Sequence, residues 1–301
     1  MLDLKRLRFL REVAERGTIS AAADALAYTP SAVSQQIAIL EEELQTPLLE
    51  RQGRNVVLTP AGKVLVAHSH AVFDAVERAT TAVSEASGEV AGRVVVGALQ
   101  SVMATLLPET IRTMSIDHPG VDLHMTELGH VDATRELRLG ALDVAVDQAY
   151  THVTNRAHRG LTKHKVLEEP LYLVVPKDSP VKKLADAAEW PWVAASLESC
   201  DCGRAVRHIS RAAGFEPDVR FETDDYGVTL ELLNSVNAVS ILPALTLTRM
   251  PSSLRRIPIA GVRRRIVALT RPAGDHRPAV GAFIEHLQRA ASELLPIVTA
   301  A

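Results

Sequence analysis

Hydrophobic positions near the start of the chain recur at helical spacing. Residues 4–16 place leucines three residues apart on one side, as in an amphipathic helix. A second helix is expected to begin at Ser20, whose hydroxyl can cap it, and to bury the run Ala21-Ala22-Ala23. Because these side chains are small, another helix can approach closely. The pattern therefore predicts a pair of packed helices.

A third helix follows a turn at residues 27–29. Thr29 supplies a capping hydroxyl, and Pro30 occupies the first helical position, where no N–H is needed. Val33, Ile37 and Leu40 then share one face, while short polar side chains lie elsewhere on the helix. A recognition helix that enters the major groove needs an apolar face beneath and hydrogen-bonding groups outside. We therefore predict a DNA-binding helix-turn-helix.

A small β-hairpin comes next, with strands at about 48–51 and 56–59 and turn-forming residues at 52–55. Arg51 and Arg54 flank its tip, and we favour contact with phosphates or the minor groove over a merely solvated surface. The residues predicted to face DNA are Ser20, Thr29, Pro30, Ser31, Ser34, Gln35, Arg51 and Arg54.

Residues from Leu4 to about Gly62 resemble the winged helix-turn-helix of LysR-type transcriptional regulators. The resemblance rests on Ser20-Ala-Ala-Ala23, Pro30-Ser31-Ala32-Val33-Ser34, Leu40-Glu41-Glu42-Glu43-Leu44 and Leu58-Thr59-Pro60-Ala61-Gly62. Thr29 and Gln35 stand where the family usually carries Gln and Arg, and Gln45 and Leu49 where it usually carries Gly and Phe. The first two positions face DNA in the family, so they bear on the target sequence rather than on the fold.

A long helix is predicted from Pro60 to about Ser87, because no proline interrupts it and Gly88 follows. Its apolar stripe has nearly a seven-residue repeat and comprises Ala61, Leu65, Val72, Val76, Ala79, Val83 and Ala86. The stripe either packs on its own domain or needs a partner helix. The resemblance implies pairing with the same helix of a second subunit, in a homodimer or homotetramer that binds an imperfect palindrome in double-stranded promoter DNA.

The pattern changes at residue 91 to alternating buried strands and helices, which predicts an α/β fold with two βαβ sets and parallel sheets. Separate strands are expected at 161–167, 171–176, 254–258 and 265–270, and a final helix at 278–295. The resemblance implies a two-lobed α/β effector-binding domain similar to periplasmic binding proteins. The expected organisation is a DNA-binding domain at 1–60, a linker and dimerisation helix at 61–90, and an effector-binding domain at 91–301, with lobe I at about 91–160 and 269–301 and lobe II at about 161–268.

A ligand is expected between the lobes, at the carboxyl ends of the strands, where helix N-termini favour a polar or anionic group. Ser101 is the foremost candidate, because family members place a hydroxyl or amide there. We interpret Asp224 as a helix cap. The candidate effector-binding residues are Gln100, Ser101, Val102, Leu128, Gly129, Ser196, Ser199, Cys200 and Thr223.

Bulk properties narrow the functional class. The 301 residues are 47% hydrophobic with a net charge of −3, and residues 1–60 hold seven basic and eight acidic side chains. DNA binding therefore requires that charges segregate locally. No run of 18 apolar residues appears and the first residues do not resemble a secretory signal, so we expect a cytoplasmic protein with no membrane partner.

Cys200 and Cys202 are separated by one residue, so a disulfide between them would close a small, strained ring. Neither this spacing nor His208 downstream is a strong metal signature, and the sequence does not decide whether these cysteines sense redox state. No nucleophile elbow, phosphate loop or paired-His motif is present, so we expect no catalytic site, no metal and no cofactor. A solute-binding protein is the alternative for the lobes alone, and the DNA-binding segment argues against it.

Overall fold

The computed structural model describes residues 2–52, 55–86, 90–128, 133–151, 158 and 160–300. Its contacts divide the chain into two compact units. The first unit comprises Met1–Ser87 with Arg135–Ala141, and the second comprises Gly88–Thr134 with Leu142–Ala301. We describe each unit by itself.

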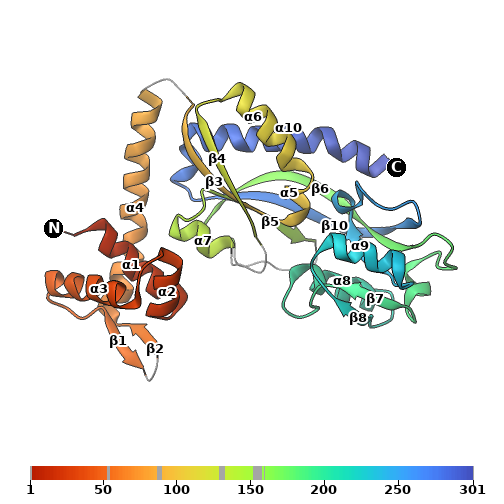
Figure 1. Ribbon diagram of the computed structural model, residues 1–301, viewed down its shortest axis with the longest axis horizontal. Helices are drawn as coiled ribbons and strands as arrows, with labels where there is room; N and C mark the ends of the chain where they lie inside the picture. Colours follow the sequence, from red (N-terminus) through yellow and green to blue (C-terminus); the bar gives the residue numbers. More distant parts are fainter. Residues whose placement is uncertain are drawn as a thin grey trace. The chain divides into compact units, whose positions relative to one another are not determined.

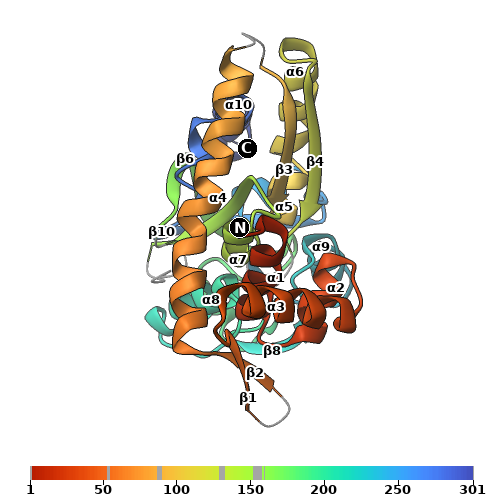
Figure 2. The same ribbon diagram turned by 90° about the vertical axis from the view of Figure 1, so that its left-hand side faces the viewer.

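Three helices form the core of the first unit: α1 (Leu4–Arg16), α2 (Ile19–Leu26) and α3 (Pro30–Leu44). Figure 2 shows them gathered beside one end of the long helix α4 (Pro60–Ala86). Ala22 and Ala23 of α2 are fully buried, as the small-residue pattern predicts. The expected cap at Ser20 is wrong, because the Thr18 hydroxyl accepts the Ala21 N–H at 3.1 Å and the helix begins two residues earlier.

The strands β1 (Leu49–Gln52) and β2 (Asn55–Leu58) form the antiparallel hairpin. It joins α4 directly, since the Thr59 hydroxyl accepts the Gly62 N–H at 3.0 Å and the Thr59 N–H donates to Leu48 O. Helix α4 continues to Ala86, and one side of it lies against α1, where the Arg11 guanidinium covers the Phe73 ring at 4.6 Å.

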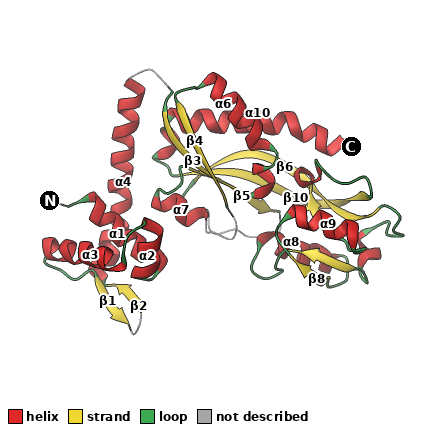
Figure 3. Ribbon diagram, viewed as in Figure 1, coloured by secondary structure: helices red, strands yellow, loops and turns green. Residues whose placement is uncertain are grey.

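The second unit is built on a six-stranded sheet in the order β4-β3-β5-β10-β6-β9, drawn in yellow in Figure 3. Strands β3 (Gly92–Ala98), β4 (Val121–Glu127) and β5 (Val144–Tyr150) are parallel, whereas β6 (Thr162–Pro176), β9 (Ser240–Pro243) and β10 (Leu254–Thr270) pair antiparallel. The expected all-parallel sheets are therefore corrected to one mixed sheet. A separate parallel pair joins β7 (Pro191–Ala194) to β8 (Asp218–Glu222).

Figure 1 shows that β6 and β10 are long neighbouring strands. Each was expected as two short strands, because charged residues and Pro170 interrupt its apolar pattern. The interruption is misleading, since Glu169 and Arg264 lie opposite each other and both side chains are fully buried as an ion pair. The Arg264 Nε donates to Glu169 Oε1 at 2.7 Å, and the Leu245 N–H donates to Glu169 Oε2 at 2.6 Å. A paired charge can thus occupy a strand interior.

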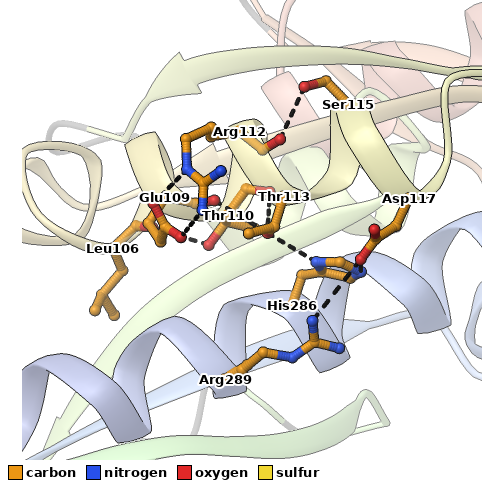
Figure 4. A network of polar contacts seen from close by, with 9 residues as sticks. All are labelled: Leu106, Glu109, Thr110, Arg112, Thr113, Ser115, Asp117, His286 and Arg289. Atoms are coloured by element: carbon orange, nitrogen blue, oxygen red, sulfur yellow. Dashed lines mark hydrogen bonds and ion pairs between the residues drawn. The ribbon is translucent and has the colours of Figure 1, made fainter.

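The helices of this unit are α5 (Gln100–Met103), α6 (Leu106–Asp117), α7 (Ala133–Leu139), α8 (Asp201–Ala212), α9 (Tyr226–Ser235) and α10 (Pro278–Ala300), with residues 135–139 of α7 assigned to the first unit. Figure 4 shows α6 and α10 joined by polar contacts that centre on His286 and Asp117. Helix α10 passes the expected end at Leu295 and contains Pro296. One apolar core lies around β3, β5 and α10, and two others lie around β7 and β9.

Candidate DNA interface and effector cavity

Helix α3 presents one apolar face and one polar face. Three apolar side chains expose at most 2% of their surface: Val33, Ile37 and Leu40. The polar side chains Ser31, Ser34 and Gln35 are exposed. At its start, the Thr29 hydroxyl accepts the Ala32 N–H at 3.2 Å and contacts the Ser31 hydroxyl at 3.0 Å. The predicted capping residue and the predicted apolar face are both confirmed, and the exposed face consists of uncharged hydrogen-bonding groups.

The acidic side chains of α3 lie at the far end of the helix, and two of them are engaged. Glu41 Oε1 accepts the N–H groups of Leu48 and Leu49 at 2.7 and 3.0 Å, which fixes the start of the hairpin. Glu43 pairs with Arg6 at 2.5 Å. The half of α3 that would meet the negatively charged DNA backbone therefore has no acidic residue.

The remaining predicted DNA-facing residues divide into two groups. Ser20, Thr29, Pro30 and Arg51 are exposed. Arg54 lies outside the described residues.

A cavity of about 160 Å³ lies in the second unit. On one side it is lined by the segment after β3 and the end of β4, and on the other by the starts of α8 and α9. Gln100 spans it, because its Oε1 accepts the Tyr226 N–H at 3.0 Å. A smaller cavity of about 40 Å³ shares Cys202, Asp224 and Tyr226 with it and continues toward Thr223.

The structure brings four of the predicted effector-binding residues to these cavities: Gln100, Leu128, Cys200 and Thr223. Ser101, Val102, Ser196 and Ser199 line neither, so their expected placement is corrected. On the short helix α5, Gln100 lines the larger cavity, whereas the next two residues, Ser101 and Val102, are buried. Gly129 lies outside the described residues.

Asp224 is a cavity residue rather than a helix cap. The cap of α9 is Asp225, whose Oδ1 accepts the Val228 N–H at 2.9 Å. This backbone hydrogen bond, opposed by desolvation and aided by Gln100, lowers the Asp225 pKa, so the carboxylate stays ionised. The N-terminus of α9 is thus already occupied by an anion of the chain itself.

Sequence patterns missed Gln148, Tyr150 and Tyr226, which come from the strand end and helix start that meet at the cavities. Burial raises the pKa of both tyrosine hydroxyls, so they remain protonated hydrogen-bond donors. The alternation of β5 could have shown that Gln148 and Tyr150 share one face, but not which face.

Cys200 and Cys202 form a disulfide, with Cα atoms 5.4 Å apart. The expectation that a one-residue spacing disfavours the bond is corrected: Cys200 precedes α8 in an extended conformation and Cys202 lies in its first turn, so the chain bends sharply between them. Both cysteines line the larger cavity. Among the described residues no cluster of three or more His, Cys, Asp or Glu can hold a metal ion.

Comparison with known proteins identifies both units. Residues 4–63 match the family model for bacterial regulatory helix-turn-helix proteins of the lysR family, and residues 87–292 match the LysR substrate binding domain. The chain belongs to the LysR family. It is therefore a DNA-binding transcriptional regulator with an effector-binding domain, and not an enzyme.

The transcriptional dual regulator GltC of Bacillus subtilis is 29% identical over 97% of this chain and 99% of its own length. A full-length OxyR variant from Pseudomonas aeruginosa has the same fold, with a TM-score of 0.66, 20% identity and coverage of 96% of this chain and 95% of that chain. CbnR, solved in complex with its target DNA, superposes with a TM-score of 0.54, 24% identity and coverage of 96% and 100%. The expected N-terminal helix-turn-helix followed by a LysR-type α/β effector-binding domain is confirmed.

The part of this LysR-family chain that the structure describes holds no helix long and apolar enough to span a bilayer.

Proposed function

We propose that this LysR-type regulator reads promoter DNA with the exposed face of α3 and with the hairpin. The observation that carries this proposal is the uncharged Ser31, Ser34 and Gln35 surface on a helix whose opposite face is fully buried. Such side chains donate to and accept from base edges in the major groove. Ser20, Thr29, Pro30, Arg51 and Arg54 complete the proposed interface.

We further propose that α4 pairs with the same helix of a second subunit. Val72, Val76 and Val83 expose 37%, 42% and 74% of their surface, and they share one stripe. A two-fold homodimer, or a homotetramer built from it, would then read an imperfect palindrome. CbnR, the structural relative that was solved with its target DNA, supports DNA as the partner.

The proposed domain organisation keeps the DNA-binding domain at 1–60, the linker helix at 61–90 and the effector-binding domain at 91–301, with lobe I at about 91–160 and 269–301 and lobe II at about 161–268. The proposed effector site is the cavity lined by Gln100, Leu128, Gln148 and Tyr226, extended by Thr223. Ser101 is not part of this proposed site, because it is buried and lines neither cavity. A cytoplasmic location follows from the proposed access to promoter DNA.

The direct test is a footprint on the promoter DNA of the full chain and of a truncated chain that begins at residue 61. The full chain is expected to protect two half-sites, and protection should weaken steeply as salt rises, since phosphate contacts release counterions. Protection by the truncated chain would contradict the assignment.

A further inference from the structure

Helix α7 belongs to the first unit by its contacts, although in the chain it lies between elements of the second. Residues 135–141 are grouped with Met1–Ser87. In the sequence, residues 129–132 connect α7 to Leu128 at the end of β4, and β5 with Gln148 follows it. Leu128 and Gln148 both line the larger cavity. The chain therefore enters and leaves α7 through elements that a ligand in the proposed site would contact.

Two arginines of α1 hold α7. The Arg16 Nη2 donates to both carboxylate oxygens of Glu136, at 2.9 and 3.1 Å. The Arg11 Nη2 donates to the Arg138 carbonyl oxygen, and the Phe73 ring of α4 covers the same guanidinium. Arg11 is 4% exposed, and the Arg16 and Glu136 side chains are 18% and 15% exposed. Such a shielded pair is stronger than an ion pair on an open surface.

Each charge of this pair has a second partner on its own helix. The Arg16 Nε donates at 2.8 Å to Oε2 of Glu12, one turn earlier on α1. On α7, the Arg135 Nε lies 3.5 Å from Glu136 Oε1. Separation of α7 from α1 would therefore leave neither Arg16 nor Glu136 as an unpaired charge. Because an unpaired buried charge is what makes an ion pair costly to break, this contact can open at a low cost.

The contact lies at the end of α1 that leads into the proposed DNA interface. Arg16 is the last residue of α1, Gly17 follows in the left-handed conformation (φ 76°), and Thr18 caps α2. Ser20 of the proposed interface is in the first turn of α2. Since α1, α2 and α3 share one apolar core, a helix docked on Arg16 restrains all three.

We propose that the docking of α7 on α1 is an autoinhibitory contact, which is closed in the DNA-free chain and opens when the first unit engages promoter DNA. A ligand that displaces the ends of β4 or β5 changes how readily α7 leaves α1, and the effector thereby controls DNA affinity. Only a difference in ligand affinity between the docked and released states can do this. The inference rests on the proposed reading of DNA by α3.

The affinity of the full chain for its promoter DNA, measured by fluorescence anisotropy, tests the contact. Glu136→Gln removes one charge of the pair, and Glu136→Arg makes the pair repulsive. We expect the two variants to bind the DNA about threefold and about tenfold more tightly than wild type.

Glu109→Gln and Glu109→Arg are the matched controls, because Glu109 is an exposed acid of α6 that pairs with Arg112 and each substitution changes the net charge equally. Both controls should bind like wild type. Unchanged or weaker binding by the two Glu136 variants, or equal gains in the Glu109 variants, would overturn the proposal.

Hydrogen exchange on the wild-type chain gives a second measurement that needs no variant. A helix of seven residues is too short to be stable without packing, so the amide protons of residues 135–141 should exchange faster when promoter DNA is added. Unchanged or slower exchange in the DNA complex would contradict the release. A chain that does not bind promoter DNA refutes the proposed function, whereas DNA binding without faster exchange in α7 refutes this inference alone.

Discussion

At the scale of single residues, the hairpin and α4 depend on a close backbone approach at Gly62. A Cβ built there would lie 2.2 Å from Leu48 O, a backbone atom that cannot move aside cheaply. Gly62→Ala should destabilise the first unit by about 1–3 kcal/mol, the usual range for overpacking. Thermal melting of the full chain measures this loss of stability. Gly281→Ala is the control, since nothing lies within 4 Å of its Cβ, and an unchanged melting curve for Gly62→Ala would contradict the packing.

Residues of the DNA interface should divide into those that position the protein on the DNA backbone and those that specify the base sequence. Arg51→Ala should weaken binding to all sequences about equally, because a phosphate contact carries no base information. Gln35→Ala should instead change the preferred base at one position of each half-site, by about 1–3 kcal/mol. Fluorescence anisotropy on a set of single-base variants of the operator separates the two effects. An equal loss on every sequence for Gln35→Ala would place Gln35 on the backbone.

Single residues also show what sequence patterns can and cannot supply. Thr29 as the cap of α3 and the buried Val33, Ile37 and Leu40 follow from helical spacing alone. The cavity does not, because Gln148 and Asp224 reach it only when strands and helices from distant parts of the chain meet. Gln45 stands where the resemblance leads one to expect Gly, and it adopts the left-handed conformation (φ 51°) that explains that preference.

At the scale of elements, α4 carries the prediction on assembly. Val72→Asp would place a charge in the proposed apolar seam, at a cost of several kcal/mol in dimer stability. Light scattering should show smaller particles, and the footprint on the promoter DNA should be weaker. Ala71→Asp is the control, because this exposed residue lies about 100° around the helix from Val72. A Val72→Asp chain that assembles like the Ala71→Asp chain would exclude α4 as the interface.

The joint between α6 and α10 should respond to pH through His286. Its ring exposes 3%, its Nδ1 lies 2.8 Å from the Thr113 hydroxyl, its Nε2 lies 3.6 Å from Asp117, and the His118 ring is 5.5 Å away. Burial lowers its pKa below the ordinary 6.5, and the Arg289 charge and His118 add to this, against the charges of Asp117 and Glu285. As the pH falls, this histidine is therefore protonated in the unfolded chain before it is protonated in the folded chain. The stability that is present above the ordinary pKa is lost as the pH falls through that value.

Calorimetric melting between about pH 7 and about pH 5 measures this loss. His286→Gln should flatten the pH dependence, while His124→Gln, at a side chain that is 47% exposed, should leave it unchanged. An identical pH profile for wild type and His286→Gln would contradict the assignment.

Helices and strands could be predicted where the period of the apolar pattern fits only one type of secondary structure. The limits of α1 follow from that period. The long strands β6 and β10 could not be predicted, because Glu169 and Arg264 look like exposed charges until each is placed opposite the other. Pairing across a sheet is non-local information that a one-dimensional pattern does not contain.

At the scale of the whole molecule, regulation requires that the effector bind two states of the protein with different affinities. Only that difference shifts the equilibrium, and typical couplings of about 1–3 kcal/mol change affinity about 5–150-fold. We expect Gln100 to sense a ligand in the proposed site, because its side chain bridges from α5 to the Tyr226 N–H at the start of α9. A bound effector that competes for or reinforces this bridge would favour one state.

The central claim, that α3 reads DNA sequence in a two-fold assembly, is tested most directly by in vitro selection from a random DNA pool with the full chain. We expect enrichment of an inverted repeat whose half-sites lie about one helical turn, or a multiple of it, apart. The same selection with a Ser34→Ala and Gln35→Ala chain should lose or alter the half-site. Enrichment of no repeat by the wild-type chain, or of the unchanged repeat by the variant, would contradict the account.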